Sequence, residues 1–412
     1  MREARARLAI RPDMPITLLL DLDDTLLDTN SEMFLPAYYR ALADHFCDAV
    51  PPDVMLAALR SGAQRMMLNR DSSRTLQQVF EEEFYPRLGG DAHVPRAGIA
   101  DFHRDVFPGL GSATRRRPGV RELIDWAQSV GHQVALATDP VLPMVATRER
   151  VRWAGLDPER FEIISSFETF HFTKTHPAYF AEVLGRMGWP DRPALMAGND
   201  VERDLLPARR LGLATFHVNG SRKSAGDHSG DLGQLREWIQ AHEGDIQAPS
   251  FDTKEAVLAV LEATPAVLQA LTADLTPARW KHEPTADDWA MIELVCHLRD
   301  TEREVHAPQV QTLLETDVPF VARPDVAVWA KQRRYLSEDG PAAVQAFAVA
   351  RAACVQRLRS VPDPVWGKLA RHAIFGPTNF LEVIGFMAEH DRLHLQQAWR
   401  TLRMPSEPAH RN

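Results

Sequence analysis

The sequence predicts two domains of different classes: an α/β domain with a doubly wound parallel sheet, followed by an all-α four-helix bundle. With 412 residues, the chain is longer than one ordinary hydrophobic core requires. Up to about residue 242, short apolar runs alternate with helical patterns, which is typical of a parallel sheet covered by helices on both faces. After Pro249 the strand patterns give way to four long helical periods, which favour an antiparallel bundle.

The first domain begins with a buried strand at 16–20, bounded by Pro15. A mostly helical insert at about 29–113 follows this strand directly. Pro118 begins the next helix, and the segment at 219–231, which is rich in Gly and Ser, is predicted to be a loop. The further strands are expected at 133–137, 161–166, 194–197 and 214–218, and the further helices at 118–127, 145–154, 177–187, 205–211 and 232–242.

The second domain shows helical periods at 257–271, 292–314, 342–361 and 381–402. These limits predict an α/β domain at 14–242 with its helical insert at about 29–113, a linker at 243–251, and a bundle at 252–405.

The composition argues against nucleic acid and membranes as partners. A net charge of -9 and a pI near 6.0 give no electrostatic reason for binding nucleic acid or an anionic membrane. No stretch of the sequence approaches the eighteen or more apolar residues of a membrane span. The three cysteines, Cys47, Cys296 and Cys354, fit a reducing cytosol better than a disulfide framework. We therefore expect a soluble cytoplasmic protein that acts on small molecules.

Asp21 and Asp23 follow the first strand directly, with Thr25 after them. In an open α/β sheet, ligands bind at the carboxyl ends of the strands. Two carboxylates one residue apart can share a site there, with Asp21 as nucleophile and metal ligand and Asp23 as the acid that protonates a leaving oxygen. An acidic turn is the alternative. A calcium loop is disfavoured, because its glycine and distal glutamate are missing.

Three further features lie at or just beyond predicted strand ends. The hydroxyl of Thr138 suits a phosphate oxygen, and the ammonium of Lys174 could offset charge on a phosphoryl group and its nucleophile. Asp200 and Asp204 could complete an all-oxygen magnesium site. Each also has a structural alternative: a helix N-cap for Thr138, a solvated amine for Lys174, and a favourable helix-dipole position for Asp204.

With these residues in this order, the chain from about 14 to 242 resembles the haloacid dehalogenase-like (HAD) hydrolase superfamily, whose core is Rossmann-like. The resemblance implies that Asp21 forms an aspartyl-phosphate, with Asp23 as general acid and then base. It implies that Thr138 and Lys174 bind the phosphoryl group. It further implies a Mg²⁺ ion held by Asp21, the backbone carbonyl of Asp23, Asp200 and Asp204. The helical insert takes the place of the family's cap, which closes over the site and selects the substrate.

The chain departs from the family's pattern at two positions. Asn199 stands where the motif Gly-Asp-x-x-x-x-Asp has its first acid, so Asp200 is expected to substitute. Thr175 stands where a proline often follows the lysine. Some members of the family dehalogenate alkanoic acids without metal, but that chemistry needs no acid two residues after the nucleophile. Asp23 therefore favours a phosphate ester as substrate.

Three histidines stand out in the second domain. His390 and His394 are four residues apart on a predicted helix, about 40° apart around its axis, so both could ligate one ion. His297 lies on an earlier helix and could supply a third ligand. Three imidazole nitrogens suit Zn²⁺, Ni²⁺, Fe²⁺ or Mn²⁺, which the ligand type alone does not separate. A polar helix face is the alternative.

This pattern, together with the run from Asp287 to Glu302, resembles the DinB-like four-helix-bundle superfamily over about residues 252–405. The resemblance implies a divalent metal held by His297, His390 and His394. The DinB-like superfamily also includes bacterial thiol-dependent transferases and isomerases, in which the metal lowers the pKa of a low-molecular-weight thiol.

Three hypotheses follow. The leading one is a Mg²⁺-dependent, capped phosphohydrolase of a small phosphorylated metabolite, fused to a metal-binding bundle. The second makes the bundle catalytic, as a thiol S-transferase or isomerase. The third makes it a binding module or a homodimerisation module.

Overall fold

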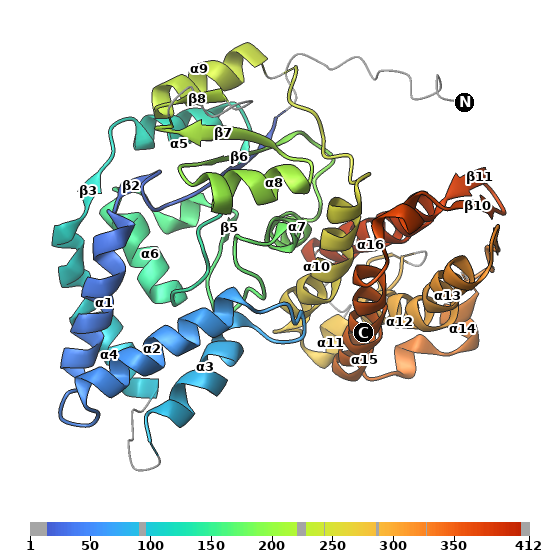
Figure 1. Cartoon of the computed structure of the whole chain (residues 1–412), viewed down its shortest axis with the longest axis horizontal. Helices are drawn as coiled ribbons and strands as arrows, with labels where there is room; N and C mark the ends of the chain where they lie inside the picture. Colours follow the sequence, from blue (N-terminus) through green and yellow to red (C-terminus); the bar gives the residue numbers. More distant parts are fainter. Residues whose placement is uncertain are drawn as a thin grey trace, which may run out of the picture. The chain divides into compact units, whose positions relative to one another are not determined.

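The computed structural model describes residues 15–89, 96–220, 228–242, 244–285, 288–326 and 328–404. The chain forms two compact units (Figure 1). The first comprises Met1–Asn69, Thr75–His176 and Asp191–Ser250, and the second comprises Arg70–Arg74, Pro177–Pro190 and Phe251–Asn412. The limits predicted at residues 14, 243 and 405 lie outside the described residues, so the domain limits stay a prediction.

A six-stranded parallel sheet forms the centre of the first unit, in the strand order β5-β4-β1-β6-β7-β8. Leu20 of β1 pairs in register with Leu136 of β4 and with Ala197 of β6, so these three strands end at the same level. The predicted α/β class is confirmed. The strands are β1 (Thr17–Leu20), β4 (Gln133–Leu136), β5 (Ile163–Ile164), β6 (Ala194–Gly198), β7 (Ala214–Val218) and β8 (His228–Gly230).

Alternate residues of the central strands face one apolar core. Leu18 and Leu20 of β1 lie in this core together with Leu123 of α5 (Val120–Ser129) and Leu235 of α9 (Leu232–His242). All four are essentially inaccessible to water, and burying each such side chain contributes about 1.5–3 kcal/mol. The core therefore fixes β1, and with it the position of the residues that follow.

The predicted loop at 219–231 is wrong at its end, because β8 pairs with β7 there. Its sequence, His-Ser-Gly, lacks the apolar alternation that indicates a strand. Residues 221–227 of the predicted loop lie outside the described part of the chain.

The helical insert is present as predicted. It contains α1 (Ser31–His45), α2 (Pro52–Met67), α3 (Leu76–Arg87) and α4 (Arg96–Asp105). Its own core includes Tyr38 and the edge-on rings of Phe102 and Phe107. A short antiparallel pair, β2 (Leu27–Asp28) and β3 (Arg115–Arg116), joins the two ends of the insert. We call α1–α4 the cap.

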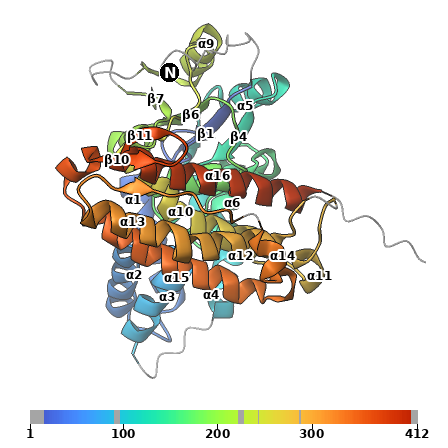
Figure 2. The same ribbon diagram turned by 90° about the vertical axis from the view of Figure 1, so that its right-hand side faces the viewer.

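The second unit is a helical bundle, and this prediction is confirmed (Figure 2). α12 (Met291–Thr301) continues through a π-helical turn, Glu302–His306, into α13 (Ala307–Glu315), and together they span the helix predicted at 292–314. α7 (Pro177–Arg186) packs against α10 (Lys254–Thr272). The bundle helices are α10 (Lys254–Thr272), α12 (Met291–Thr301), α13 (Ala307–Glu315), α15 (Gly340–Arg359) and α16 (Phe380–Arg403), with short α11 (Pro277–Trp280) and α14 (Trp329–Gln332). A three-stranded sheet was not predicted: β9 (Phe320–Val321), β10 (Leu369–His372) and β11 (Gly376–Asn379).

Among the described residues, one helix, α10, is long and apolar enough to cross a membrane by length and composition, contrary to the expectation from sequence. In the structure, 67% of its apolar window is buried. The burial explains the apolar character of α10, because this helix packs in the core of the bundle.

Candidate active site and candidate metal centre

The candidate active site lies at the carboxyl edge of the sheet. Asp21 follows β1 directly, and its backbone N–H donates to the carbonyl of Ala197 at 3.1 Å. Thr138 and Asn199 follow β4 and β6. Because the three strands end in register, these residues reach one edge, where a cavity of about 280 Å³ is found. Asp21, Asp23, Lys174, Asn199, Asp200 and Asp204 all line this cavity.

Lys174 joins two of the predicted acids. Its side chain is buried, and its Nζ lies 2.5 Å from Asp21 Oδ1 and 2.6 Å from Asp204 Oδ1. Gly198 makes room for this arrangement, because a Cβ there would overlap the Asp204 carboxylate. Two carboxylates and one ammonium thus share a buried site.

The charges in this site are not balanced by Lys174 alone. Burial raises the pKa of Asp204, the Lys174 ammonium opposes this, and the Asp21 carboxylate adds to it, with a net increase. One further positive charge beside Asp21 and Asp204 would stabilise both carboxylates. The donor set therefore fits a cation with a preference for oxygen ligands.

Asp23 lies on the wall of the same cavity and forms an ion pair with Arg150. Arg150 comes from α6 (Met144–Trp153) and is 3% exposed. Burial lowers the pKa of Arg150 to about 10, and the Asp21 carboxylate acts in the opposite direction. The pair holds the Asp23 carboxylate in a fixed place. Arg150 was not predicted, because nothing in the sequence distinguishes it among the three arginines of its helix.

Asn199 and Asp200 have different surroundings. Asp200 Oδ1 accepts the N–H groups of Glu202 and Arg203 and so caps the following turn. The side-chain amide nitrogen of Asn199 donates to the carbonyl of Asp23 at 2.8 Å and to Asp21 Oδ2 at 3.2 Å. Adjacent oxygen ligands of Mg²⁺ at about 2.1 Å are separated by about 3.0 Å, so the same end of the amide, turned to present its oxygen, would fit such a site.

The structure places Thr138 differently from the acids. It is buried, and the residues that line the cavity include Asp139 but not Thr138. Asp139 pairs with Arg203 at 2.5 Å. Both residues were missed from sequence, although Asp139 directly follows the predicted strand-end threonine.

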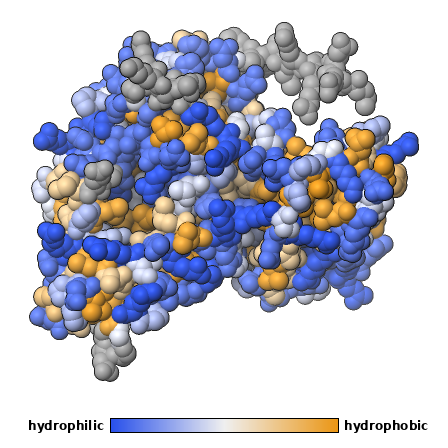
Figure 3. Space-filling model, viewed as in Figure 1, coloured by the Kyte–Doolittle hydropathy of each residue, from blue (hydrophilic) through white to orange (hydrophobic). Residues whose placement is uncertain are grey.

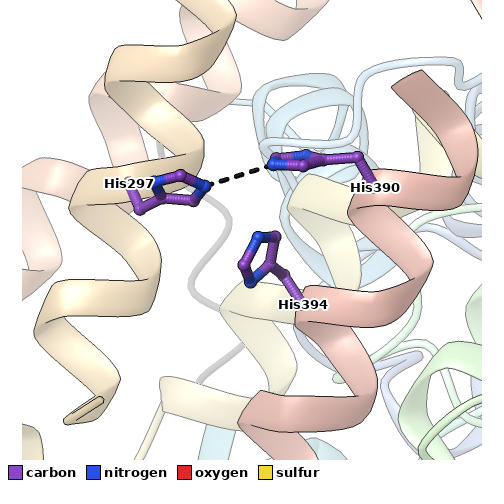
Figure 4. A group of neighbouring side chains, drawn as sticks. All are labelled: His297, His390 and His394. Atoms are coloured by element: carbon purple, nitrogen blue, oxygen red, sulfur yellow. Dashed lines mark hydrogen bonds between the residues drawn. The ribbon is translucent and has the colours of Figure 1, made fainter. Parts of the chain in front are cut away.

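The candidate metal centre lies in the second unit, where the three predicted histidines converge (Figure 4). His297 comes from α12, and His390 and His394 come from α16. The Nε2 atoms of His297 and His390 are 3.1 Å apart, and one nitrogen from each histidine lies within 4.8 Å of the others. Adjacent nitrogen ligands of a tetrahedral ion at about 2.0–2.1 Å are separated by about 3.3 Å, so the histidines fit a transition metal.

Electrostatics keep these imidazoles neutral. Burial, reinforced by the neighbouring histidines, lowers the pKa of His297 to about 2. Burial and His390 lower the pKa of His394 to about 4. Neutral imidazole is the form that binds metal.

A buried ion network lies behind the histidines. Arg351, 1% exposed, donates to Glu302 at 2.8 Å and pairs with Asp391. His306 Nδ1 lies 3.1 Å from Glu302 Oε2, and Asp391 Oδ1 lies 3.7 Å from His390 Nδ1. The network therefore connects to the ring of one candidate ligand.

Family models match both parts of the chain. The model described as haloacid dehalogenase-like hydrolase matches residues 17–212, and the model described as DinB superfamily matches residues 260–398. The chain is a HAD-like hydrolase domain fused to a DinB superfamily domain. The predicted resemblance, and the prediction of a hydrolase of the phosphatase class, are confirmed.

Curated relatives match the HAD-like domain. A glyceraldehyde 3-phosphate phosphatase of Methanocaldococcus jannaschii is 26% identical over 207 residues, which cover 49% of this chain and 83% of that protein. A protein of the same name from Pyrococcus abyssi is 27% identical over 203 residues, which cover 48% of this chain and 79% of that protein.

Solved structures match each domain at low similarity. A HAD phosphatase from Thermococcus onnurineus shares 17% identity with a TM-score of 0.38, covering 54% of this chain and 97% of that one. YfiT from Bacillus subtilis, a four-helix bundle protein, shares 17% identity with a TM-score of 0.34, covering 37% of this chain and 88% of that one.

Proposed function

We propose that the HAD-like domain is a Mg²⁺-dependent phosphohydrolase that acts on a small phosphorylated metabolite through an aspartyl-phosphate on Asp21. The observation that carries the proposal is the position of Lys174, whose ammonium lies between Asp21 and Asp204 at hydrogen-bond distance. An ammonium at this place orients the nucleophile and offsets the charge of an incoming phosphoryl group.

In the proposed reaction, an Asp21 oxygen attacks phosphorus and the bond to the leaving oxygen breaks. Asp23 gives its proton to that oxygen and then takes a proton from the water that hydrolyses the aspartyl-phosphate. Inorganic phosphate leaves and Asp21 is regenerated. Arg150 positions Asp23. Thr138 was expected from sequence to bind the phosphoryl group, but it is not among the residues that line the cavity, and we propose instead that it supports the phosphoryl-binding turn.

We propose Asp21, the carbonyl of Asp23, Asn199 and Asp204 as the residues that hold Mg²⁺. When bound, Mg²⁺ would offset negative charge on the phosphoryl oxygens. Asp200 was the ligand expected from sequence, but its Oδ1 is engaged as a helix cap, and we therefore favour Asn199.

The first test uses the full chain with Mg²⁺ and a generic phosphomonoester such as p-nitrophenyl phosphate. Wild type is expected to release phosphate, and Asp21→Asn to lose this activity to the background level. A wild type that is inert across a broad panel of phosphate esters, or an unimpaired Asp21→Asn variant, would overturn the proposal.

The ligand assignment has its own test, a titration of activity with Mg²⁺. Asn199→Ala is expected to raise the Mg²⁺ concentration for half-maximal activity by about tenfold or more, whereas Asp200→Ala is expected to shift it far less. The reverse order would return the ligand role to Asp200.

For the DinB domain, we propose a second divalent metal, Zn, Ni, Fe or Mn, held by His297, His390 and His394. The convergence of three neutral imidazoles supports this. Elemental analysis of the dialysed and reconstituted full chain is expected to give about one equivalent, and His394→Ala far less. Less than about 0.1 equivalent in wild type would contradict the site.

Two roles of the DinB domain can be distinguished with the full chain. The domain either catalyses a thiol-dependent transfer or isomerisation, or serves as a binding or homodimerisation module. Metal-dependent consumption of a low-molecular-weight bacterial thiol, lost in His394→Ala, would favour catalysis. An unchanged thiol level, together with a change in oligomeric state on metal removal, would favour the module.

A further inference from the structure

A second cavity of about 250 Å³ lies beside the active-site cavity of the HAD-like domain. Residues of the cap helices form most of its wall, and the segment after Thr138 completes it. Val141 and Leu142 line both cavities, so the two spaces adjoin at these residues. The Mg²⁺ and phosphate chemistry proposed above does not use this second space.

The wall of this cavity is aromatic and aliphatic. The rings of Tyr39, Phe80, Tyr85 and Phe167 line it, and all four are only partly buried. Leu42 and Leu59 lie deeper. Hydrophobic residues are visible over the cap in the space-filling view (Figure 3). Half-buried aromatic rings around a hollow favour an apolar occupant.

Several polar side chains of this wall already have partners. The hydroxyl of Tyr38 lies 3.2 Å from His103 Nε2, and Gln77 donates to Glu81 at 2.8 Å. Glu168 accepts the backbone N–H of Met144 at 2.8 Å. Among the described residues that line the cavity there is no lysine or arginine. The wall therefore offers little to a second phosphate or a carboxylate.

We propose that this cavity binds the organic part of the substrate, and that the substrate is a phosphomonoester whose organic part is apolar and about as large as an aromatic ring. The inference rests on the proposed phosphatase function and specifies its substrate class. An apolar cavity of about 150 Å³ accommodates benzene, so the volume here suffices for a substituted ring.

A small polyhydroxylated ester fits this cavity poorly. Its hydroxyl groups would lose water on entering a cavity whose wall is mostly aromatic and aliphatic, and each hydrogen bond that is not replaced disfavours binding. A substrate as short as a triose phosphate would also leave the aromatic wall unused. The curated relatives' named substrate is therefore not the class that we infer for this chain.

The test measures kcat/KM of the full chain with Mg²⁺ for methyl, propyl, hexyl and 3-phenylpropyl phosphate, with glycerol phosphate for comparison. These esters are all alkyl esters, so the chemical step changes little along the series. We expect kcat/KM to rise roughly two- to fourfold for each buried methylene, and glycerol phosphate to fall below propyl phosphate.

Two matched variants locate the effect. Ala100 lines the cavity from α4, and Ala57 is exposed on α2 away from it. Ala100→Trp is expected to reduce the ratio of hexyl to methyl efficiency by about tenfold, whereas Ala57→Trp is expected to preserve the ratio.

Hydrolysis of methyl and glycerol phosphate with a flat or inverted dependence on chain length would overturn this inference and leave the proposed phosphatase intact. An equal response of the two tryptophan variants would likewise overturn the assignment of the cavity. Absence of hydrolysis of every ester would overturn the proposed function itself.

Discussion

The two candidate sites of this chain concentrate ionisable groups in opposite ways. In the HAD-like domain, Asp21 and Asp204 are buried beside one ammonium, that of Lys174. In the DinB domain, the first layer is three neutral imidazoles, and the charged groups Glu302 and Asp391 stand behind them. In the acidic site the charged side chains line the cavity itself. In the histidine site the charged side chains lie behind the imidazoles that are the candidate ligands.

Each site contains one buried cation that contacts two carboxylates, Lys174 in the HAD-like domain and Arg351 in the DinB domain. Lys174 contacts two carboxylates that are themselves proposed to meet a metal and a phosphoryl group, so its charge takes part in the chemistry. Arg351 contacts two buried carboxylates, those of Glu302 and Asp391, that lie behind the histidines, so we expect its charge to have a structural role. We therefore expect the same ratio of two acids to one base to have a chemical consequence in one domain and a structural consequence in the other.

The largest expected effect concerns the acid in the HAD-like site. Asp23→Asn removes the proton donor, and general acid catalysis typically contributes 10²–10⁴-fold. We expect kcat for an alkyl phosphate to fall by about that factor, and kcat for p-nitrophenyl phosphate to fall much less, since its leaving group needs little protonation. Equal losses for both esters would mean that Asp23 does not act as the acid.

The next effect tests the structural cation. Arg351→Leu would leave Glu302 and Asp391 buried without their partner, and removing one member of a buried ion pair costs about 3–5 kcal/mol. We expect a decrease of that size in the free energy of unfolding, measured by urea titration.

The matched control for Arg351→Leu lies on α16, where Arg392 pairs with the more exposed Glu389. Arg392→Ala is expected to change the free energy of unfolding by less than about 1 kcal/mol. Similar decreases in the free energy of unfolding for the two variants would contradict the expected difference between a buried ion network and a partly exposed ion pair.

The chemical cation should behave differently. Lys174→Met is expected to lower kcat by about 10²–10³-fold, as does the loss of one charged donor at a reacting group. Because Asp21 and Asp204 would then lack their ammonium, added Mg²⁺ should raise the melting temperature of this variant more than that of wild type. A Mg²⁺ response equal to that of wild type would argue against a metal at these carboxylates.

The sequence predicts strand ends better than side-chain partners. Asp21 and Asp204 could be anticipated because buried parallel strands bring their last residues to one edge. Arg150 could not, because its role depends on how α6 packs, and the three arginines of that helix look alike in the sequence. The choice between Asn199 and Asp200 likewise depends on a backbone cap that residue types do not reveal. The short strands β8 to β11 carry little apolar alternation and escape prediction for that reason.

The smallest expected effect is the pH-dependent stability contributed by one buried histidine, His132, which lies outside the three-histidine cluster of the DinB domain. His132, in the HAD-like domain, accepts the N–H of Ile16 through Nδ1, and burial, together with Arg192, lowers its pKa to about 4. The folded state resists protonation, so stability is full above the unfolded pKa of about 6.5 and is lost as the pH falls from there towards 4. We expect this loss to be about 1–3 kcal/mol in urea titrations of wild type and smaller in His132→Gln. A metal chelator should leave the His132 contribution unchanged while it alters the stability of the DinB domain. If the chelator changed both the His132 contribution and the stability of the DinB domain, the two domains would not unfold independently.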